Sequence, residues 1–192
     1  MKSGKTTLYF SDGGPHNTEA TLEKVQETVL EENIQYVVVA TGGKTLHQAA
    51  HLFQKEMASG LTLVGVTLQA GTWKEYGEPN WDVLEEARSL GAKVLTCTHS
   101  LMGSVESAVM KKFGGLPPAE LIAYTYYTFS QGTKVAVEVT LSAVDAGIIP
   151  AGVDAVGVGG SGEGADTALL LHTVSTVDFF DLKIREVLCK PR

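Results

Sequence analysis

The chain has 192 residues, 44% of them hydrophobic and 19% charged, and this length suffices for one sizeable core. Twenty-two acidic residues against fifteen lysines and arginines leave a net charge of −7, so we expect no nucleic-acid partner. No apolar stretch is long enough for a signal peptide or membrane span, and the two cysteines match no metal-ligand spacing. We therefore expect a single cytoplasmic domain over 1–192, without a metal and with reduced thiols.

Strand-like and helix-like patterns alternate through the first half of the chain. In order, they predict a strand over 7–10, a helix capped by Asn17 or Thr18, a strand over 37–39, a helix over 45–57, a strand over 61–68, a helix over 81–90 capped by Asn80, and a strand over 93–98. The unbroken apolar run of 61–68 is typical of a strand that is buried on both faces.

The second half predicts a helix over 100–113, a longer helical region over 119–146 divided at Gly132, a strand over 155–158, a glycine-rich loop, and an antiparallel edge strand over 168–174. Alternation of this kind is the signature of an α/β fold. We predict a three-layer α/β/α domain whose sheet is mostly parallel, with an antiparallel strand at one edge.

The most informative motif lies where the strand at 37–39 turns into the next helix. Gly42 and Gly43 let the backbone approach a ligand closely, and the first amides of a helix have no intrahelical acceptor. These amides also lie at the positive end of the helix dipole, which favours anions. Lys44 adds a positive charge, and Thr41 and Thr45 add hydroxyl groups. The motif predicts a site for the phosphate group of a small molecule.

Two nucleotide-binding patterns are incomplete. A P-loop that ended in Gly43 and Lys44 would need a glycine at position 38, where this chain has valine. The glycines of 157–162 satisfy a dinucleotide fingerprint, but a strand pattern follows them where that site requires a helix. We therefore expect neither a triphosphate nor a dinucleotide site.

Five other polar or reactive side chains each have more than one interpretation. His99 is a candidate acid or base, or packs beside the following helix, and Cys97 is a nucleophile or a small buried residue. Glu138 orients a ligand or basic group, forms a structural ion pair, or faces solvent. His47 and His51 lie one helical turn apart, and without an evident third ligand they indicate a solvated helix face rather than a metal site.

Segments spread over nearly the whole chain carry a family resemblance: 17–19, 37–50, 61–67, 91–93, 100–107, 145–150, 154–174, 179–181 and 189–192. Three of them, 37–50, 61–67 and 154–174, resemble the C-terminal α/β domain of pyruvate kinase. Taken over nearly the whole chain, the sequence resembles more closely the stand-alone proteins described as pyruvate kinase C-terminal-domain-like. The resemblance implies a domain without the catalytic barrel, whose ligand binds between two loops at the carboxyl ends of strands. Those loops match 41–45 and 159–167 here.

The resemblance also bears on the ligand. Some pyruvate kinases hold a sugar bisphosphate with a loop rich in serine and threonine, whereas this chain has Ala40, Gly42 and Gly43 at the aligned positions. Fewer hydroxyls suit a single phosphate, and for the stand-alone proteins the resemblance implies flavin mononucleotide (FMN). The expected FMN contacts are Thr41, Gly42, Gly43, Lys44, Thr45, Trp73, His99, Gly160, Gly164, Ala165, Asp166 and Thr167.

Three roles remain open at this point. The chain is an FMN-binding protein, an FMN-dependent oxidoreductase with His99 or Cys97 near the ring, or a regulatory domain that binds a sugar phosphate. Trp73 or Tyr76 either forms a wall for the flavin ring or anchors its loop by local packing. The predicted edge strand and the apolar segment 179–182 indicate a homo-oligomer.

Overall fold

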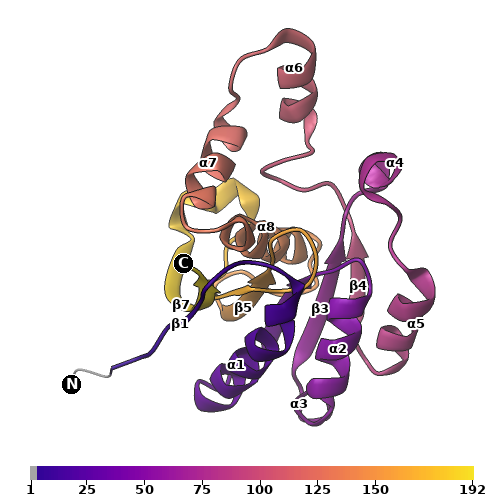
Figure 1. The fold of residues 1–192 in the computed structure, drawn as a ribbon, viewed down its shortest axis with the longest axis vertical. Helices are drawn as coiled ribbons and strands as arrows, with labels where there is room; N and C mark the ends of the chain where they lie inside the picture. Colours follow the sequence, from indigo (N-terminus) through magenta and orange to yellow (C-terminus); the bar gives the residue numbers. More distant parts are fainter. Residues whose placement is uncertain (1–3) are drawn as a thin grey trace.

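A twisted seven-stranded sheet forms the centre of the computed structural model, which describes residues 4–192 (Figure 1). The strands are ordered β1-β7-β6-β5-β2-β3-β4 across the sheet, and among them only β6 runs against the others. Their bounds are β1 Leu8–Phe10, β2 Tyr36–Ala40, β3 Thr62–Thr67, β4 Lys93–Thr96, β5 Asp154–Gly159, β6 Thr167–His172 and β7 Lys183–Pro191.

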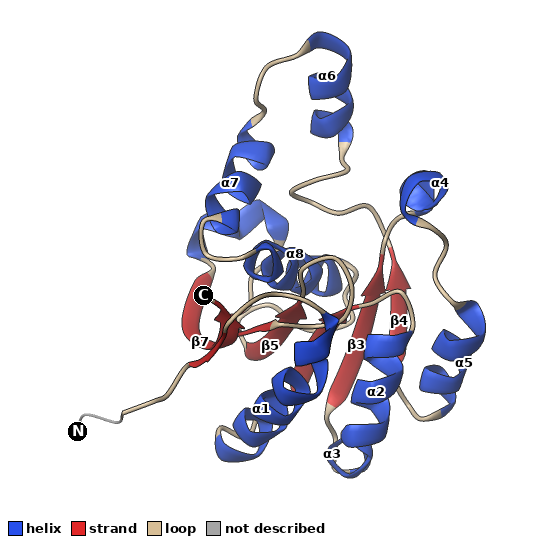
Figure 2. Cartoon of the chain, in the orientation of Figure 1, coloured by secondary structure: helices blue, strands red, loops and turns tan. Residues whose placement is uncertain are grey.

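Helices cover both faces of this sheet, so the predicted three-layer α/β/α class is confirmed (Figure 2). On one face, α1, α2 and α5 pack against the strands through side chains such as Val25, Leu46 and Leu84, and α8 covers the other face. The helices are α1 Thr18–Glu31, α2 Lys44–Leu52, α3 Gln54–Ala58, α4 Trp73–Tyr76, α5 Trp81–Ser89, α6 Val105–Phe113, α7 Pro118–Tyr127 and α8 Gln131–Asp145, with 3₁₀ turns η1 Pro15–Asn17, η2 Ala70–Thr72 and η3 Thr176–Asp181.

Helix α8 approaches β5 closely because the strand carries glycine where the two backbones meet. A Cβ atom on Gly157 would lie 2.7 Å from the carbonyl oxygen of Ala136, and one on Gly159 would lie 2.4 Å from that of Gly132. Real Cβ atoms do not tolerate such contacts with backbone, so a larger residue at either position would push the helix away. The close approach seats the first turn of α8 beside the carboxyl end of β5.

The antiparallel strand β6 is not at an edge of the sheet, contrary to the prediction. Strand β7 pairs with β6 along its outer side, and β1 pairs with β7. Strand β7 carries charged residues at exposed or half-buried positions, among them Lys183, Arg185 and Glu186. Because these residues interrupt its apolar pattern, the sequence did not predict this strand. Its last residues are buried between β6 and β1, which comes from the other end of the chain, and in the core cluster that includes α1.

Three predicted helix boundaries also move. The helix expected over 45–57 is divided at Phe53 into α2 and α3. The helix expected over 100–113 begins only at Val105, because the preceding residues form a loop and Ser104 caps the helix. The longer helical region is interrupted before Gly132, where the Oγ of Ser130 accepts the amide of Thr133 and starts α8.

Of the helix caps read from the sequence, one forms as expected. The Oδ1 of Asn80 accepts the amide of Val83 at 3.2 Å and starts α5. Asn17 does precede α1, but its side chain donates to the carbonyl of Asp12 instead of capping the helix. Within residues 4–192, none of the helices has the length and apolar character needed to cross a bilayer.

Candidate functional site

The loops that follow four neighbouring strands converge at one edge of the sheet, the edge formed by the carboxyl ends of these strands. Because β5, β2, β3 and β4 are parallel and adjacent, their carboxyl ends lie at the same edge, as Figure 2 shows. Val39 of β2 pairs directly with Val158 of β5, which brings the two predicted ligand loops next to each other. The edge therefore has the position at which open α/β sheets bind ligands.

In the first loop, Thr41 shapes the turn that starts α2. Its Oγ1 accepts hydrogen bonds from the amides of Gly43, at 2.9 Å, and Leu46, at 3.2 Å. The amide of Asn80 donates to the carbonyl of Gly42 at 2.8 Å and fastens the loop to α5. Gly43 has a φ of 135°, a conformation that disfavours any larger residue. The loop is thus held in shape by the chain itself before any ligand is present.

The next amides of this turn remain open. Among the described residues, nothing accepts a hydrogen bond from the amides of Lys44 and Thr45. Lys44 is exposed and makes no ion pair within 4–192, and Gly42 is exposed with no atom within 4 Å of where its Cβ would lie. Gly42 is therefore not required by the packing of the chain, and the loop is uncovered at this residue, two positions before the unpaired amides.

The second loop, residues 160–166, is closed by its own contacts. Asp166 is fully buried, and its Oδ2 accepts the amides of Gly14 and Ser161, both at 2.9 Å. Its Oδ1 accepts the hydroxyl of Thr167 at 2.8 Å. Through these bonds the carboxylate joins the second loop to the segment around Gly14, so Asp166 has a structural role in the chain. A direct contact between Asp166 and a ligand stays a prediction.

The neighbouring predicted residues are similarly packed. A Cβ on Gly160 would lie 2.5 Å from the carbonyl oxygen of Gly164, so the loop folds tightly on itself. The amide of Ala165 donates to the Oγ1 of Thr18 at 3.0 Å, and Thr167 contacts the Oγ of Ser130 at 3.1 Å. The structure brings all of these residues to the predicted edge, with Ala165 and Thr167 beneath its surface.

Sequence reasoning missed a third loop at this edge, residues 11–17, which follows β1. Gly14 donates its amide to Asp166, and Thr18 accepts the amide of Ala165, so this loop is attached to the second one. The available signal was Gly13-Gly14 directly after a strand and before a helix, the same pattern that marked Gly42 and Gly43.

Trp73 packs locally, in agreement with one of the two interpretations of the aromatic loop. Its Nε1 donates to the carbonyl of Leu68 at 2.8 Å, and its ring meets that of Trp81 edge to face at 5.6 Å. These contacts hold α4 against the start of α5. Tyr76, by contrast, is exposed.

A buried polar cluster lies below the loop that follows β4. The Glu138 side chain is 1% exposed, and its Oε1 accepts the amides of Leu101 and Met102, both at 2.8 Å. Its Oε2 pairs with Lys134 and lies 3.3 Å from the Nδ1 of His99. Burial alone would raise the pKa of Glu138, but the His99 hydrogen bond and the Lys134 charge outweigh it and hold this pKa below its usual value.

The cluster ties three segments of the fold together. The Nε2 of His99 lies 3.1 Å from the carbonyl oxygen of Thr67 at the end of β3, while its Nδ1 faces Glu138 on α8. Each ring nitrogen therefore already faces an acceptor. Of the interpretations considered for Glu138, the structural ion pair is the one formed.

The remaining reactive side chains offer little chemistry. Burial raises the pKa of the Cys97 thiol and raises that of Cys189 to about 11, which favours the unreactive protonated form. The Nε2 atoms of His47 and His51 are 3.2 Å apart, and Glu86 lies 3.2 Å from His47. In the described part of the chain, no group of three or more His, Cys, Asp or Glu side chains is placed to hold a metal ion.

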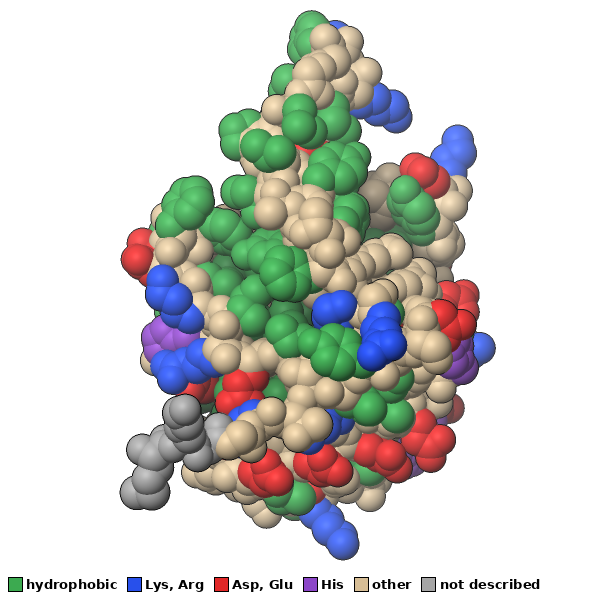
Figure 3. All heavy atoms as spheres, turned by 60° about the vertical axis from the view of Figure 1, so that its left-hand side comes forward, with side chains coloured by type: hydrophobic (Ala, Val, Ile, Leu, Met, Phe, Trp, Pro, Cys, Tyr) green, Lys and Arg blue, Asp and Glu red, His purple; other side chains and the backbone are tan. Residues whose placement is uncertain are grey.

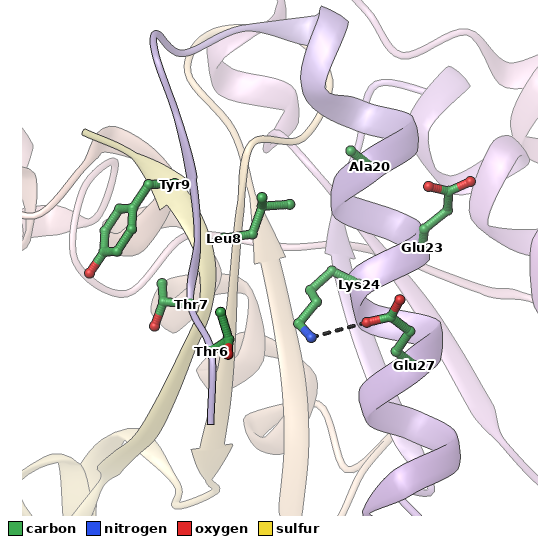
Figure 4. A pocket seen from close by; sticks show the side chains of 8 residues that line it. All are labelled: Thr6, Thr7, Leu8, Tyr9, Ala20, Glu23, Lys24 and Glu27. Carbon is green, nitrogen blue, oxygen red and sulfur yellow. Dashed lines mark hydrogen bonds and ion pairs between the residues drawn. The ribbon is translucent and has the colours of Figure 1, made fainter. Parts of the chain in front are cut away.

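A surface cavity of about 370 Å³ opens between β1 and α1 (Figure 4). It contains an ion pair of 3.0 Å between Lys24, which is half-buried, and Glu27, which is exposed, both on α1. None of the residues expected to bind FMN belongs to its lining, which consists of Thr6, Thr7, Leu8, Tyr9, Ala20, Glu23, Lys24 and Glu27.

No protein-family model matches this chain. Among solved structures, it is similar to a lysine-to-alanine mutant of O-ureido-L-serine synthase with bound O-ureido-L-serine, at 18% sequence identity and a TM-score of 0.32. The similarity covers 70% of this chain and 39% of that protein, so the chain spans about two fifths of its length. We take nothing about function from a similarity this weak.

Proposed function

We propose that this chain binds a phosphorylated small molecule, with FMN as the first ligand to test, at the turn between β2 and α2. The observation that carries the proposal is the pair of open amides of Lys44 and Thr45 beside the uncovered Gly42. Helix N-termini with unpaired amides favour phosphate oxygens through hydrogen bonds and the helix dipole. The exposed ammonium group of Lys44 adds an ionic contact.

The choice of FMN rests on the resemblance to the stand-alone pyruvate kinase C-terminal-domain-like proteins. The open amides of Lys44 and Thr45 support a ligand with one phosphate at this turn, while the second loop uses its acidic side chain and the amides of Ser161 and Ala165 within the chain. Binding is favoured over catalysis, since His99 is engaged on both ring nitrogens and the pKa of Cys97 is raised.

The direct test is an absorption spectrum of the freshly purified chain, followed by mass spectrometry of any small molecule released on denaturation. A flavin spectrum and the mass of FMN would support the proposal. A colourless protein that also fails to bind added FMN would exclude this ligand, and titration with sugar phosphates would then test the phosphate site alone.

Substitutions in the first loop should weaken FMN binding selectively. We expect Lys44→Ala to cost about 1.5–3 kcal/mol, or about ten- to hundredfold in Kd, through loss of a charge-assisted contact. Gly42→Val should also weaken binding, because it adds a branched side chain to the uncovered loop two residues before the open amides, while its Cβ would meet nothing in the chain. Flavin fluorescence titration measures both.

Two comparisons make this test specific. Lys55→Ala, which removes an exposed lysine from α3, should leave the affinity for FMN unchanged. Riboflavin, which lacks the phosphate, should bind more weakly than FMN and should be insensitive to Lys44→Ala. Equal losses for FMN and riboflavin would mean that Lys44 contacts another part of the flavin.

A further inference from the structure

Helices α6 and α7 form an arm, residues 105–127, whose outer helix projects away from the body of the molecule (Figure 1). None of the residues of α6 is buried. The arm is attached at its base, where Ala123 is buried and the Oγ of Ser107 donates to the buried carboxylate of Glu120 at 2.6 Å. The arm is therefore attached by specific contacts, but none of residues 4–192 covers its outer surface.

The outer helix has the pattern of a helix that buries one face. Val105, Val109 and Phe113 recur at four-residue spacing, which places them on the same side, yet their side chains are 80%, 45% and 74% exposed. An exposed Phe or Val is ordinary when it stands alone. Three of them in register on a projecting helix are typical of a surface that packs against another molecule.

The apolar surface continues from the arm toward the body. Between residues 114 and 129 the sole charged residue is Glu120, which is buried, so this stretch exposes only neutral side chains. Depletion of charge and enrichment in aromatics characterise the core of protein–protein interfaces. Figure 3 shows hydrophobic side chains gathered along the arm and on the body below it. The exposed apolar side chains are Val105, Val109, Phe113, Leu116, Leu121, Tyr124 and Phe129 on the arm and its end, and Val177 and Phe180 on η3.

Turn η3 lies next to the arm's base, because Tyr126 of α7 and Phe179 of η3 pack in the same cluster against α8. Large apolar side chains in this number present on the order of 1,000 Å², comparable with the 800 Å² or so that each partner buries in a standard interface. The area available is therefore sufficient for a stable dimer.

We propose that the occupant of this surface is a second copy of the chain, with the arm of each copy packed on η3 of the other. Charge supports this pairing: α6 carries exposed Lys111 and Lys112 in a chain of net charge −7, and η3 carries exposed Asp178 and Asp181. When two copies face each other across a two-fold axis, the arm of each meets η3 of the other, so both charge pairs form at once and the dimer is closed.

Sedimentation of the full chain over a wide concentration range tests this proposal. The wild type should sediment at twice 20.4 kDa, and Phe113→Asp should shift it to the monomer or weaken association at least tenfold. Phe113 is exposed, so the variant should keep the wild-type circular dichroism and unfolding midpoint. The matched control is Leu30→Asp on α1, where the leucine is 65% exposed, and it should remain dimeric.

Charge reversal tests which surfaces meet. Changing Lys111 and Lys112 to glutamate should weaken the dimer, and changing Asp178 and Asp181 to lysine in the same chain should restore it. A failure of this restoration would overturn the pairing of the arm with η3.

A wild type that sediments at 20.4 kDa at every concentration would overturn the dimer, as would a Phe113→Asp variant that associates like the wild type. Flotation of such a monomer with anionic vesicles would assign the arm to a membrane surface instead.

Discussion

Glu138→Ala should lower the free energy of unfolding by about 3–5 kcal/mol, the usual effect of removing one partner from a buried ion pair. The substitution leaves the Lys134 ammonium without its carboxylate and leaves the amides of Leu101 and Met102 without their acceptor. Because the amides belong to the loop after β4, that loop should also lose order. Urea unfolding followed by circular dichroism measures the loss as a shift of the midpoint at constant slope.

The control for this prediction is Glu85→Ala on α5. Glu85 also pairs with a basic residue of its own helix, Arg88, but its side chain is 71% exposed. Exposed pairs contribute little, so the change in unfolding free energy should stay within about 1 kcal/mol. Similar effects for the two variants would show that the cluster around Glu138 contributes no more than a surface ion pair.

The same carboxylate makes a pH-dependent contribution to stability. Because the pKa of Glu138 is held below its ordinary value of 4.5, its ionised form stabilises the fold above that pH, and the contribution is lost as the pH falls further through the lowered pKa. The stability difference between the wild type and Glu138→Gln should be largest near neutral pH and shrink below 4.5. A difference that stayed constant into acid would contradict a lowered pKa.

Asp166→Ala should be destabilising by about 3 kcal/mol or more, since hydrogen bonds to a charged group each contribute about 1.5–3 kcal/mol. The variant would leave the amides of Gly14 and Ser161 without an acceptor and detach the loop after β1 from the loop after β5. Thermal unfolding and hydrogen exchange of these amides measure the two effects.

The matched control is Asp12→Ala in the loop after β1, where the carboxylate is exposed and contacts only His16 among the described residues. Its effect on stability should be small. If Asp166→Ala instead unfolded at the wild-type midpoint but bound FMN more weakly, Asp166 would be a ligand contact rather than a link between loops.

Local patterns were sufficient to predict most of the elements. The apolar run that became β3, the Asn80 cap of α5 and the glycine turn before α2 all depend on residues within one or two turns of each other. Strand β7 could not be predicted in this way. Its burial comes from contacts with distant segments, among them β6 and β1, whose Leu8 lies opposite Cys189 at the other end of the chain.

The candidate site shows the same difference between features set by local sequence and features set by distant contacts. The turn over 41–45 was predicted as an anion site from its own residues; the amides of Lys44 and Thr45 are open there, and anion binding stays a prediction. Asp166 looked like a similar ligand residue, because nothing near it in sequence indicates that Gly14 donates to its carboxylate. Likewise, in the sequence Glu138 is an isolated acid in an apolar helix, and only the structure shows that the amides of Leu101 and Met102 donate to it.

By itself, the sequence determined the α/β class, the positions of the main strands along the chain and the turn that carries Lys44. These features follow from periodicity, caps and glycines, which act through local backbone geometry. Tertiary structure alone decided that β6 lies inside the sheet, that Asp166 and Glu138 fasten loops, and that α6 stands away from the body. The physical reason is that burial and pairing are set by contacts between residues far apart in the chain, which a local pattern does not encode.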